Sequence, residues 1–270
     1  MGNIESIGTD LLFNTIKKTF ICEKHGPVEC NVTIIAGKAL EAYCPLCQAE
    51  YEKELNEKEE QKRKEKNKRV FIEKMKEMNI EEEFYFSTLD SYIPQVQSQA
   101  AAKKAIKELI EQKHGKVILL GSNGGGKTHL GTCAVKALCG KVYSMYEIST
   151  MIRQAYSPLA KKSELEIVQE LASIPMLFID EMGRSKGSSA ELNWLSFILD
   201  KRHQRHLPFV LASNTHLSSD CPHGKKGCEE CFENFLGNDI ISRLGQDSKI
   251  IKMYDAPDYR RKKILGGNKL

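Results

Sequence analysis

The 270-residue sequence lacks features that mark several common protein classes. It has no run of about eighteen apolar residues, so we expect no membrane-spanning helix. No basic segment followed by an apolar one opens the chain, and we therefore expect a cytoplasmic protein. No internal repeat is visible, and the absence of an Asn-Lys-x-Asp motif disfavours a GTPase. The net charge of +4 permits contact with nucleic acid but does not require it.

The most informative feature present is a phosphate-binding loop. Residues 121–128 fit G-x-x-x-x-G-K-[ST] and lie between a predicted buried strand and a predicted helix. In that context, backbone N–H groups and the positive helix end surround a phosphate. Lys127 is expected to reach the β- and γ-phosphates of ATP, and Thr128 to ligate Mg²⁺. The predicted nucleotide-binding residues of this segment are Gly121, Ser122, Asn123, Gly124, Gly125, Gly126, Lys127, Thr128 and His129.

Two later apolar runs end in polar side chains suited to ATP hydrolysis. The first, 176–181, ends in Asp180 and Glu181 and is typical of a buried parallel strand. Asp180 is predicted to hold Mg²⁺, and Glu181 to orient and deprotonate the attacking water. The second run, 208–214, ends in Asn214. Its order in the chain favours a sensor of the γ-phosphate over a residue that only caps a turn.

Alternation of strands and helices predicts an α/β fold with a five-stranded parallel sheet flanked by helices. The ligand should then lie at the carboxyl ends of the strands. The predicted strands lie near 116–121, 141–146, 176–181, 208–214 and 248–254. We divide the chain into a zinc-binding module (1–50), a charged helical linker (51–78) and an ATPase domain (79–270).

The linker is dense in Glu, Lys and Arg and has no Pro or Gly between residues 51 and 76. Acids and bases alternate at helical spacing, which predicts a long solvated helix. A simple spacer and a docking arm for a partner fit this pattern equally well.

Nine cysteines in a chain expected to be cytoplasmic indicate metal binding rather than disulfides. Cys22-x-x-His25 and Cys44-x-x-Cys47 form two closely spaced pairs, which suit a tetrahedral Zn²⁺. Cys30 competes with His25 as the fourth ligand, but the spacing of His25 mirrors the second pair.

A second group lies in one short segment, 221–231. Cys221, His223, Cys228 and Cys231 offer a ligand set for another Zn²⁺. The Cys-x-His half is tighter than a usual zinc knuckle, so a charged surface loop with unligated thiols is an equal alternative.

Together these motifs resemble the DnaC-type helicase loaders, AAA+ ATPases of the DnaC/IstB-like family, in particular phage-like versions with an N-terminal zinc knuckle. The resemblance runs from about Cys22 to Lys263. Besides the zinc, phosphate-loop and strand-end motifs, it rests on the segments Phe86-Ser87-Thr88-Leu89-Asp90-Ser91-Tyr92 and Asp239-Ile240-Ile241-Ser242-Arg243-Leu244.

Further site residues are implied by the resemblance alone. Arg243 resembles the arginine finger that acts on ATP held by a neighbouring subunit. Arg260 or Arg261 resembles the second sensor arginine, although the chain has no room for a full lid domain. The helix at 147–156 resembles the segment that faces DNA, where Ser149, Thr150 and Arg153 would contact phosphates.

The resemblance also implies a function in a bacterial or phage-infected cell. ATP-bound subunits would assemble into an oligomer, open a replicative DnaB-type hexameric helicase and admit single-stranded DNA. An IstB-type transposition ATPase that coats duplex DNA is the first alternative. A zinc-dependent nucleic-acid adaptor with a switching nucleotide site is the second, and the intact Glu181 argues against it.

Overall fold

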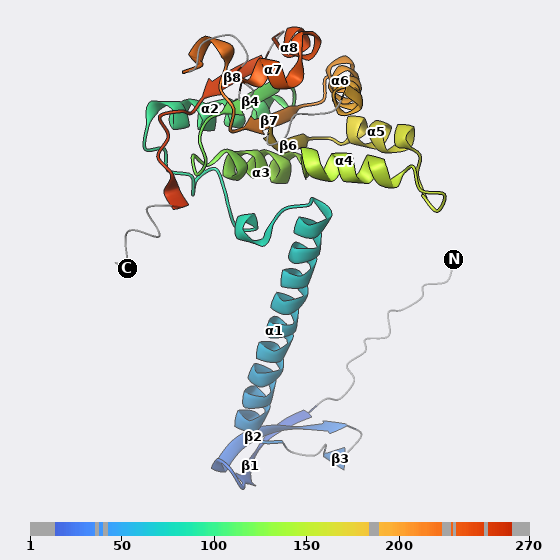
Figure 1. Cartoon of the computed structure of the whole chain (residues 1–270). Coiled ribbons are helices and arrows are strands. Elements are labelled where there is room, and N and C mark those ends of the chain that lie inside the picture. Colours follow the sequence, from blue (N-terminus) through green and yellow to red (C-terminus); the bar gives the residue numbers. More distant parts are fainter. Residues whose placement is uncertain are drawn as a thin grey trace, which may run out of the picture. The chain divides into compact units, whose positions relative to one another are not determined.

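The computed structural model describes residues 14–35, 38–39, 43–183, 189–222, 228, 231–245 and 248–260. The chain divides into an N-terminal unit, Met1–Val70, and a C-terminal unit, Phe71–Leu270. The boundary lies inside helix α1 (Pro45–Glu77), and each unit is described by itself (Figure 1). None of the described helices is both long enough and apolar enough to cross a membrane.

The N-terminal unit is a small antiparallel sheet followed by the charged part of α1. Strands β1 (Asn14–Cys22) and β2 (Gly26–Ile35) form a hairpin, and β3 (Lys38–Ala39) pairs with the end of β2. Its buried apolar side chains, among the described residues up to 70, are Cys22, Cys30, Val32 and Cys44. Such a core is too small to stabilise the unit unaided.

Helix α1 confirms the predicted charged helix. All of residues 51–70 are exposed, and i,i+4 ion pairs such as Lys64–Glu60 at 2.7 Å lie along its surface. The character of the helix changes in its last two turns. Phe71 and Ile72 are partly buried and Met75 is buried, because these residues pack in the core of the C-terminal unit.

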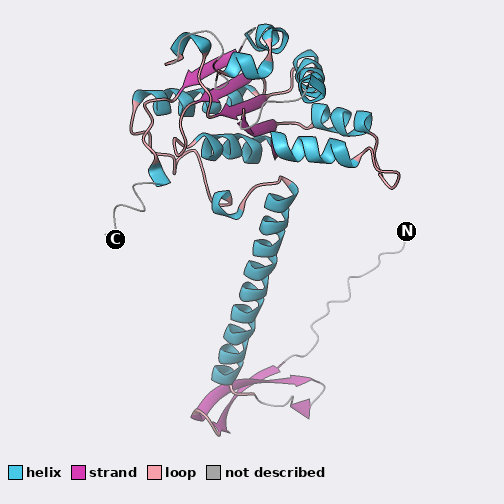
Figure 2. Ribbon diagram, viewed as in Figure 1, coloured by secondary structure: helices cyan, strands magenta, loops and turns pink. Residues whose placement is uncertain are grey.

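The C-terminal unit contains the predicted parallel sheet of five strands, in the order β5-β6-β7-β4-β8 (Figure 2). Each predicted strand is confirmed, with ends that shift by a few residues. The strands are β4 (Lys116–Leu120), β5 (Lys141–Ser144), β6 (Leu177–Met182), β7 (Phe209–Ser213) and β8 (Ser248–Lys252). Their carboxyl ends share one edge of the sheet.

Helices cover both faces of this sheet. The helices are α2 (Gln97–Gln112), α3 (Lys127–Leu138), α4 (Met145–Gln154), α5 (Glu164–Ser173), α6 (Ser189–Gln204), α7 (Phe232–Leu236) and α8 (Asn238–Gly245), with short 3-10 turns at Glu82–Phe84 and Ser218–Asp220. Helices α2 and α3 pack on one face, and α4 to α8 contribute to the core on the other.

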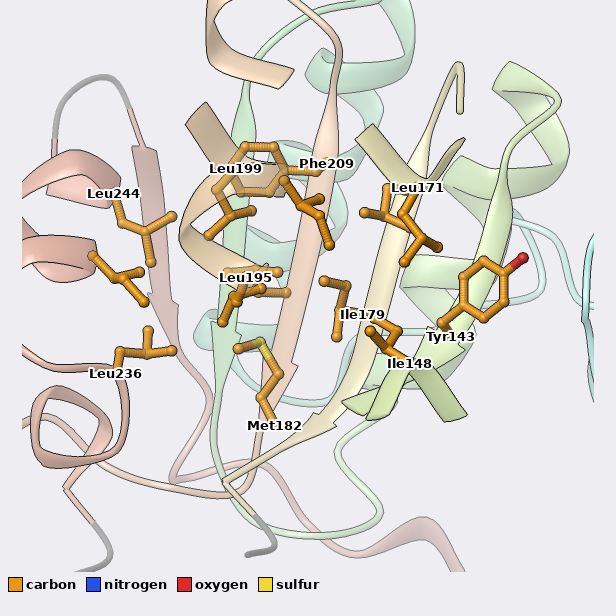
Figure 3. Packing of buried hydrophobic residues seen from close by; sticks show 14 of the residues in the cluster. Tyr143, Ile148, Leu171, Ile179, Met182, Leu195, Leu199, Phe209, Leu236 and Leu244 are labelled. Carbon is orange, nitrogen blue, oxygen red and sulfur yellow. The ribbon is translucent and has the colours of Figure 1, made fainter. Parts of the chain in front are cut away.

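Alternation along each strand divides the core into two layers. In β4, Ile118 points to the layer shared with α4 to α8, whereas Leu119 points to the layer shared with α2 and α3. Figure 3 shows the first layer, in which Phe209 of β7 lies near Leu199 of α6 and Leu244 belongs to α8. Both layers are mainly apolar around the central strands, with Arg202 as a fully buried exception that donates to the carbonyls of Leu171, Ile174 and Pro208.

Candidate nucleotide site and metal centres

The phosphate loop joins β4 to α3, as the sequence predicts. Gly124 and Gly126 have positive φ angles of 77° and 90°, a region in which side chains other than glycine are strained. A Cβ at Gly124 would lie 1.9 Å from Oδ1 of Asp258, and one at Gly126 would lie 2.3 Å from the ring of Tyr92. Both glycines are therefore required by the conformation of the loop and by the segments packed against it.

Three groups outside the motif fix the loop from behind. The hydroxyl of Tyr92 donates to the Gly125 carbonyl at 2.8 Å, and the amide of Gln99 donates to the same oxygen at 3.2 Å. The backbone N–H of Tyr259 donates to the Gly124 carbonyl at 3.2 Å. The sequence did not indicate these supports, because Tyr92 and Gln99 lie 33 and 26 positions from Gly125 in the chain.

Lys127 is buried at the start of α3. Its ammonium group donates to the carbonyls of Gly121 at 2.8 Å and Ser122 at 2.7 Å. Burial lowers the pKa of Lys127 to about 8, and the nearby charge of Asp180 only partly opposes this shift. The carbonyls of the loop thus hold the ammonium group at the position where α3 begins.

Thr128 and Asp180 lie side by side although 52 positions separate them in the chain. The Thr128 hydroxyl donates to Oδ2 of Asp180 at 2.6 Å, and the backbone N–H of Glu181 donates to Oδ1 at 2.7 Å. Burial raises the pKa of the Asp180 carboxyl group above its ordinary value, although these hydrogen bonds oppose the rise. A hydroxyl and a carboxylate oxygen in this arrangement suit Mg²⁺, which prefers oxygen ligands.

Glu181 leaves the regular strand geometry. Its φ is 54°, and the pairing of β6 with β7 shifts register between Ile179 and Met182. A left-handed backbone at a residue other than glycine costs about 1–3 kcal/mol and clusters at functional sites. The side chain is exposed at the same edge as Asp180, which suits a group that must reach a water molecule.

Asn214 directly follows β7, the strand between β6 and β4, and its side chain is exposed. The Ser213 hydroxyl donates to the Met182 carbonyl and accepts from the backbone N–H of Thr215 at 3.1 Å. This network joins the ends of β6 and β7. The structure therefore brings Asn214 to the edge where the phosphate loop and Asp180 lie.

The other residues predicted to contact the nucleotide, His129 and the three arginines, differ in where the structure places them. The ring nitrogen Nε2 of His129 donates to the Thr88 carbonyl at 2.8 Å, so this side chain holds the preceding segment. The charge of Arg260 is close enough to contribute to the lowered pKa of Lys127. The Arg243 backbone belongs to α8, but its side chain and all of Arg261 lie outside the described residues.

One predicted DNA contact needs correction. Ser149 on α4 is only 3% exposed, and its hydroxyl donates to Glu191 at 2.6 Å. A hydroxyl buried in this way does not reach a DNA phosphate. Thr150 donates to the Tyr146 carbonyl at 2.8 Å, and the exposed Arg153 donates through Nε to the Ser149 carbonyl at 3.2 Å. DNA contacts by Thr150 and Arg153 remain predictions.

The N-terminal unit brings the four residues of the first predicted metal site together. The ligand atoms of Cys22, His25, Cys44 and Cys47 lie within 4.8 Å of one another. Nδ1 of His25 is 3.7, 3.6 and 3.3 Å from the three sulfurs in that order. A tetrahedral Zn²⁺ would set sulfur–nitrogen separations of about 3.6 Å. Cys30, the competitor, instead donates to the Lys18 carbonyl at 3.2 Å.

The hairpin turn prepares this group for a metal. Backbone N–H groups of His25 and Lys24 point at the Cys22 sulfur and lower its pKa to about 6, which favours the thiolate that a metal requires. Glu50 on α1 accepts from Nε2 of His25 at 3.2 Å. A carboxylate on the second ring nitrogen is the usual outer partner of a metal-bound histidine.

The second group has a different fourth member from the one that the sequence suggested. Cys221, Cys228 and Cys231 gather with His216, with all four ligand atoms within 4.8 Å. Nε2 of His216 lies 3.6 Å from the Cys228 sulfur and 3.5 Å from the Cys231 sulfur. The predicted ligand His223 lies outside the described residues. His216 was missed because it precedes the cysteine segment and follows the Asn214 strand end.

Comparison with known proteins agrees with this arrangement. The model of the family described as IstB-like ATP binding protein matches residues 38–263. The chain belongs to the IstB-like ATP binding protein family. It is an AAA+ ATPase, as the resemblance implies.

Individual relatives of this IstB-like protein are distant. The replicative helicase loader DnaC of Escherichia coli (strain K12) is 21% identical over 181 residues, which is 64% of this chain and 69% of that protein. A crystal structure of the DnaC helicase loader matches with a TM-score of 0.52 at 17% identity, over 64% of this chain and 99% of that one. A crystal structure of DnaI gives 0.50 at 19% identity, over 65% and 95%. These structural matches show the fold.

Proposed function

We propose that this ATPase loads a replicative DnaB-type hexameric helicase onto single-stranded DNA and hydrolyses ATP at its subunit interfaces. The observation that carries the proposal is the agreement between sequence and fold. The relative detected by sequence is a helicase loader, and the fold match extends over 99% of the loader crystal structure. The presence of Lys127, Asp180 and Glu181 at the sheet edge supports a loader that turns ATP over rather than one that only binds it.

Each described residue at the edge has a role in this mechanism. Lys127 leaves the loop carbonyls and neutralises the β- and γ-phosphates, and the loop N–H groups hold the remaining oxygens. Thr128 and Asp180 suit Mg²⁺, which would neutralise charge on the phosphates. Glu181 takes a proton from the attacking water, and Asn214 contacts the γ-phosphate from the neighbouring strand end.

Assembly completes the site in this proposal. Arg243 on α8 acts on the ATP of the adjacent subunit, where a guanidinium offsets charge on the transferred phosphoryl group. Arg260 senses nucleotide within its own subunit, close to Lys127. Hydrolysis therefore requires an oligomer, and we propose that single-stranded DNA runs along α4, where Arg153 is exposed.

The N-terminal unit is proposed to grip the helicase. Cys22, His25, Cys44 and Cys47 fit Zn²⁺ in donor type and in spacing, and the metal would hold the hairpin to the start of α1. The exposed Ile21 and Tyr43 lie beside these ligands and offer apolar contacts to a partner.

A loading assay tests the proposal. The full-length protein, the resident replicative helicase and a circular single strand are mixed with ATP, and helicase bound to the circle is measured. The parent protein should raise loading at least tenfold. Lys127→Ala should abolish it, because ATP binding is lost, whereas Glu181→Gln should form the ATP-dependent complex with helicase but not release it. The absence of any complex between helicase and the Glu181→Gln protein contradicts the loader function.

The family match favours one second candidate. IstB-like proteins give the family its description, so a transposition-targeting ATPase that coats duplex DNA is the alternative. ATPase activity stimulated more strongly by duplex than by single-stranded DNA, together with filaments on duplex DNA, would favour this candidate over the loader.

A further inference from the structure

The second Cys/His group lies between two catalytic parts of the ATPase fold. His216 is two positions beyond Asn214, and Cys231 directly precedes α7. A parallel bridge pairs His216 with Cys231, and the Phe232 N–H donates to the His216 carbonyl at 2.8 Å. The backbone thus already brings the two ends of this insert together before any metal is considered.

The donor set identifies the class of ligand. Three thiols and one imidazole nitrogen converge. The His216 nitrogen lies 3.5 and 3.6 Å from the sulfurs of Cys231 and Cys228, which matches the edge of a zinc tetrahedron, about 3.6 Å. Cys231 is fully buried, and none of the cysteines forms a disulfide. Four protein ligands close the coordination shell, which is typical of a structural zinc rather than a catalytic one.

A few hydrogen bonds and one ion pair also hold the described residues of the insert. Ser218 donates its backbone N–H to the Glu233 carboxylate at 2.8 Å, and Lys252 pairs with Asp220 at 2.8 Å. Both of these links are at most partly buried, and exposed ion pairs contribute little. The Asn234 side-chain amide and the Cys231 backbone N–H both donate to the Cys228 carbonyl, at 2.8 and 3.3 Å. These bonds hold the backbone beside Cys228 but leave the converging thiol groups to a further ligand.

Beyond the insert, the chain leads directly to the proposed arginine finger. Phe232 and Leu236 of α7 are buried in the core layer that also holds Ile240 and Leu244 of α8. Gly237 alone joins the two helices. Because the link is so short, the position of α7 restricts the position of α8, which carries the Arg243 backbone.

We propose that His216, Cys221, Cys228 and Cys231 bind a structural Zn²⁺ that fastens the chain after Asn214 to the start of α7. The metal fixes the γ-phosphate sensor and the arginine-finger helix relative to each other within one subunit. The metal site stands on the described geometry alone, whereas its coupling role rests on the roles proposed for Asn214 and Arg243.

Metal analysis of the full-length protein tests the site. The parent protein and Cys139→Ser, an exposed cysteine outside both groups, should each hold about two Zn²⁺ per chain, on the four-ligand count for structural zinc. Cys228→Ser and Cys44→Ser should each hold about one. Should Cys228→Ser not fold, Cys221→Ser serves for the same measurement. About one Zn²⁺ in the parent, unchanged by Cys228→Ser or Cys221→Ser, overturns the proposal.

Variants of two histidines, His216 and His223, distinguish the proposed ligand set from the set that the sequence suggested. His216→Ala should lose about one Zn²⁺ per chain, whereas His216→Cys should keep it, because Cys₄ sites also bind zinc. His223→Ala should leave the metal count unchanged. Loss of zinc from His223→Ala together with retention by His216→Ala overturns the proposed ligands.

Enzymatic turnover tests the coupling role separately. Cys228→Ser should bind ATP with parental affinity but hydrolyse it at least tenfold more slowly, as Arg243→Ala should. Parental turnover by a variant that has lost the second Zn²⁺ overturns the coupling. Neither result depends on the helicase or on DNA, so failure here is distinct from failure of the proposed loading function.

Discussion

The two Cys/His groups use the same donor set in very different surroundings. In the N-terminal unit, Cys22 and Cys44 are themselves half of the four buried apolar side chains described up to residue 70. In the C-terminal unit, Cys231 adjoins a core layer that extends from β5 to α8. A metal bound by the N-terminal group would substitute for a hydrophobic core. A metal bound by the C-terminal group would fasten one insert to a domain that already has a core.

The largest expected effect is therefore at the first group. Cys44→Ser should unfold the N-terminal unit, because zinc binding provides about 10–16 kcal/mol in small modules of this kind. ATP binding by the C-terminal unit should persist, and helicase binding should be lost. Amide dispersion in NMR spectra and a fluorescent ATP analogue measure the two outcomes. Retention of helicase binding would move the docking surface elsewhere, with the charged part of α1 as the first region to examine.

An intermediate effect is expected at the second group. Cys228→Ser should leave the C-terminal unit folded and lower its Tm by on the order of 5 °C, as for a loss of about 2 kcal/mol in a domain of this size. Limited proteolysis should cut first within the insert. Complete unfolding of the C-terminal unit would show that the second metal also replaces a core and would remove the contrast between the groups.

The smallest expected effect sharpens the contrast without unfolding either unit. Glu50→Gln weakens the acceptor for the outer ring nitrogen of His25, so zinc affinity at the first group should fall about 10–100-fold. Affinity at the second group should not change. Competition with a graded series of chelators measures both, and an equal loss at the two groups would contradict the assignment of Glu50.

The sequence predicted those features of the fold and site that depend on residues close together in the chain. The strands, the phosphate loop and Asp180 follow from short patterns, because hydrophobic runs and glycine spacing act within a few residues. Tyr92 was missed as a support of the loop, because its partner Gly125 lies 33 positions away and only the fold joins them. His216 was missed for the same reason, since 15 positions separate it from Cys231.

Ser149 was wrongly predicted to contact DNA, because its burial depends on Glu191 of α6, which lies 42 positions away in the chain. Ile148 and Ile152 mark the buried face of α4, and Ser149 lies next to that face, where Glu191 accepts its hydroxyl. The resemblance drew attention to the helix as a whole. Helical periodicity places Ser149 and Arg153, four positions apart, on the same side of α4, so only the fold separates the buried Ser149 from the exposed Arg153.

The burial of Lys127 links nucleotide binding to the acidity of the solution. Burial lowers the pKa of Lys127 to about 8, and the negative charge of bound ATP would raise it. Below about pH 7 the lysine is already protonated, so binding takes up no proton there. Above pH 8, ATP binding should draw a proton from the buffer, and affinity should fall by up to about tenfold per pH unit.

Calorimetry at pH 8.5 in two buffers of different ionisation enthalpy should therefore give different binding heats. At pH 6.5 the heats should agree, apart from protons that ATP itself releases on binding beside the lysine. Glu181→Gln, which keeps the lysine and the loop, should behave like the parent. Equal heats at pH 8.5 would show that Lys127 stays charged without nucleotide. Different heats would show that, under alkaline conditions, each ATP binds together with one proton. The buffer supplies that proton and so takes part in the binding equilibrium.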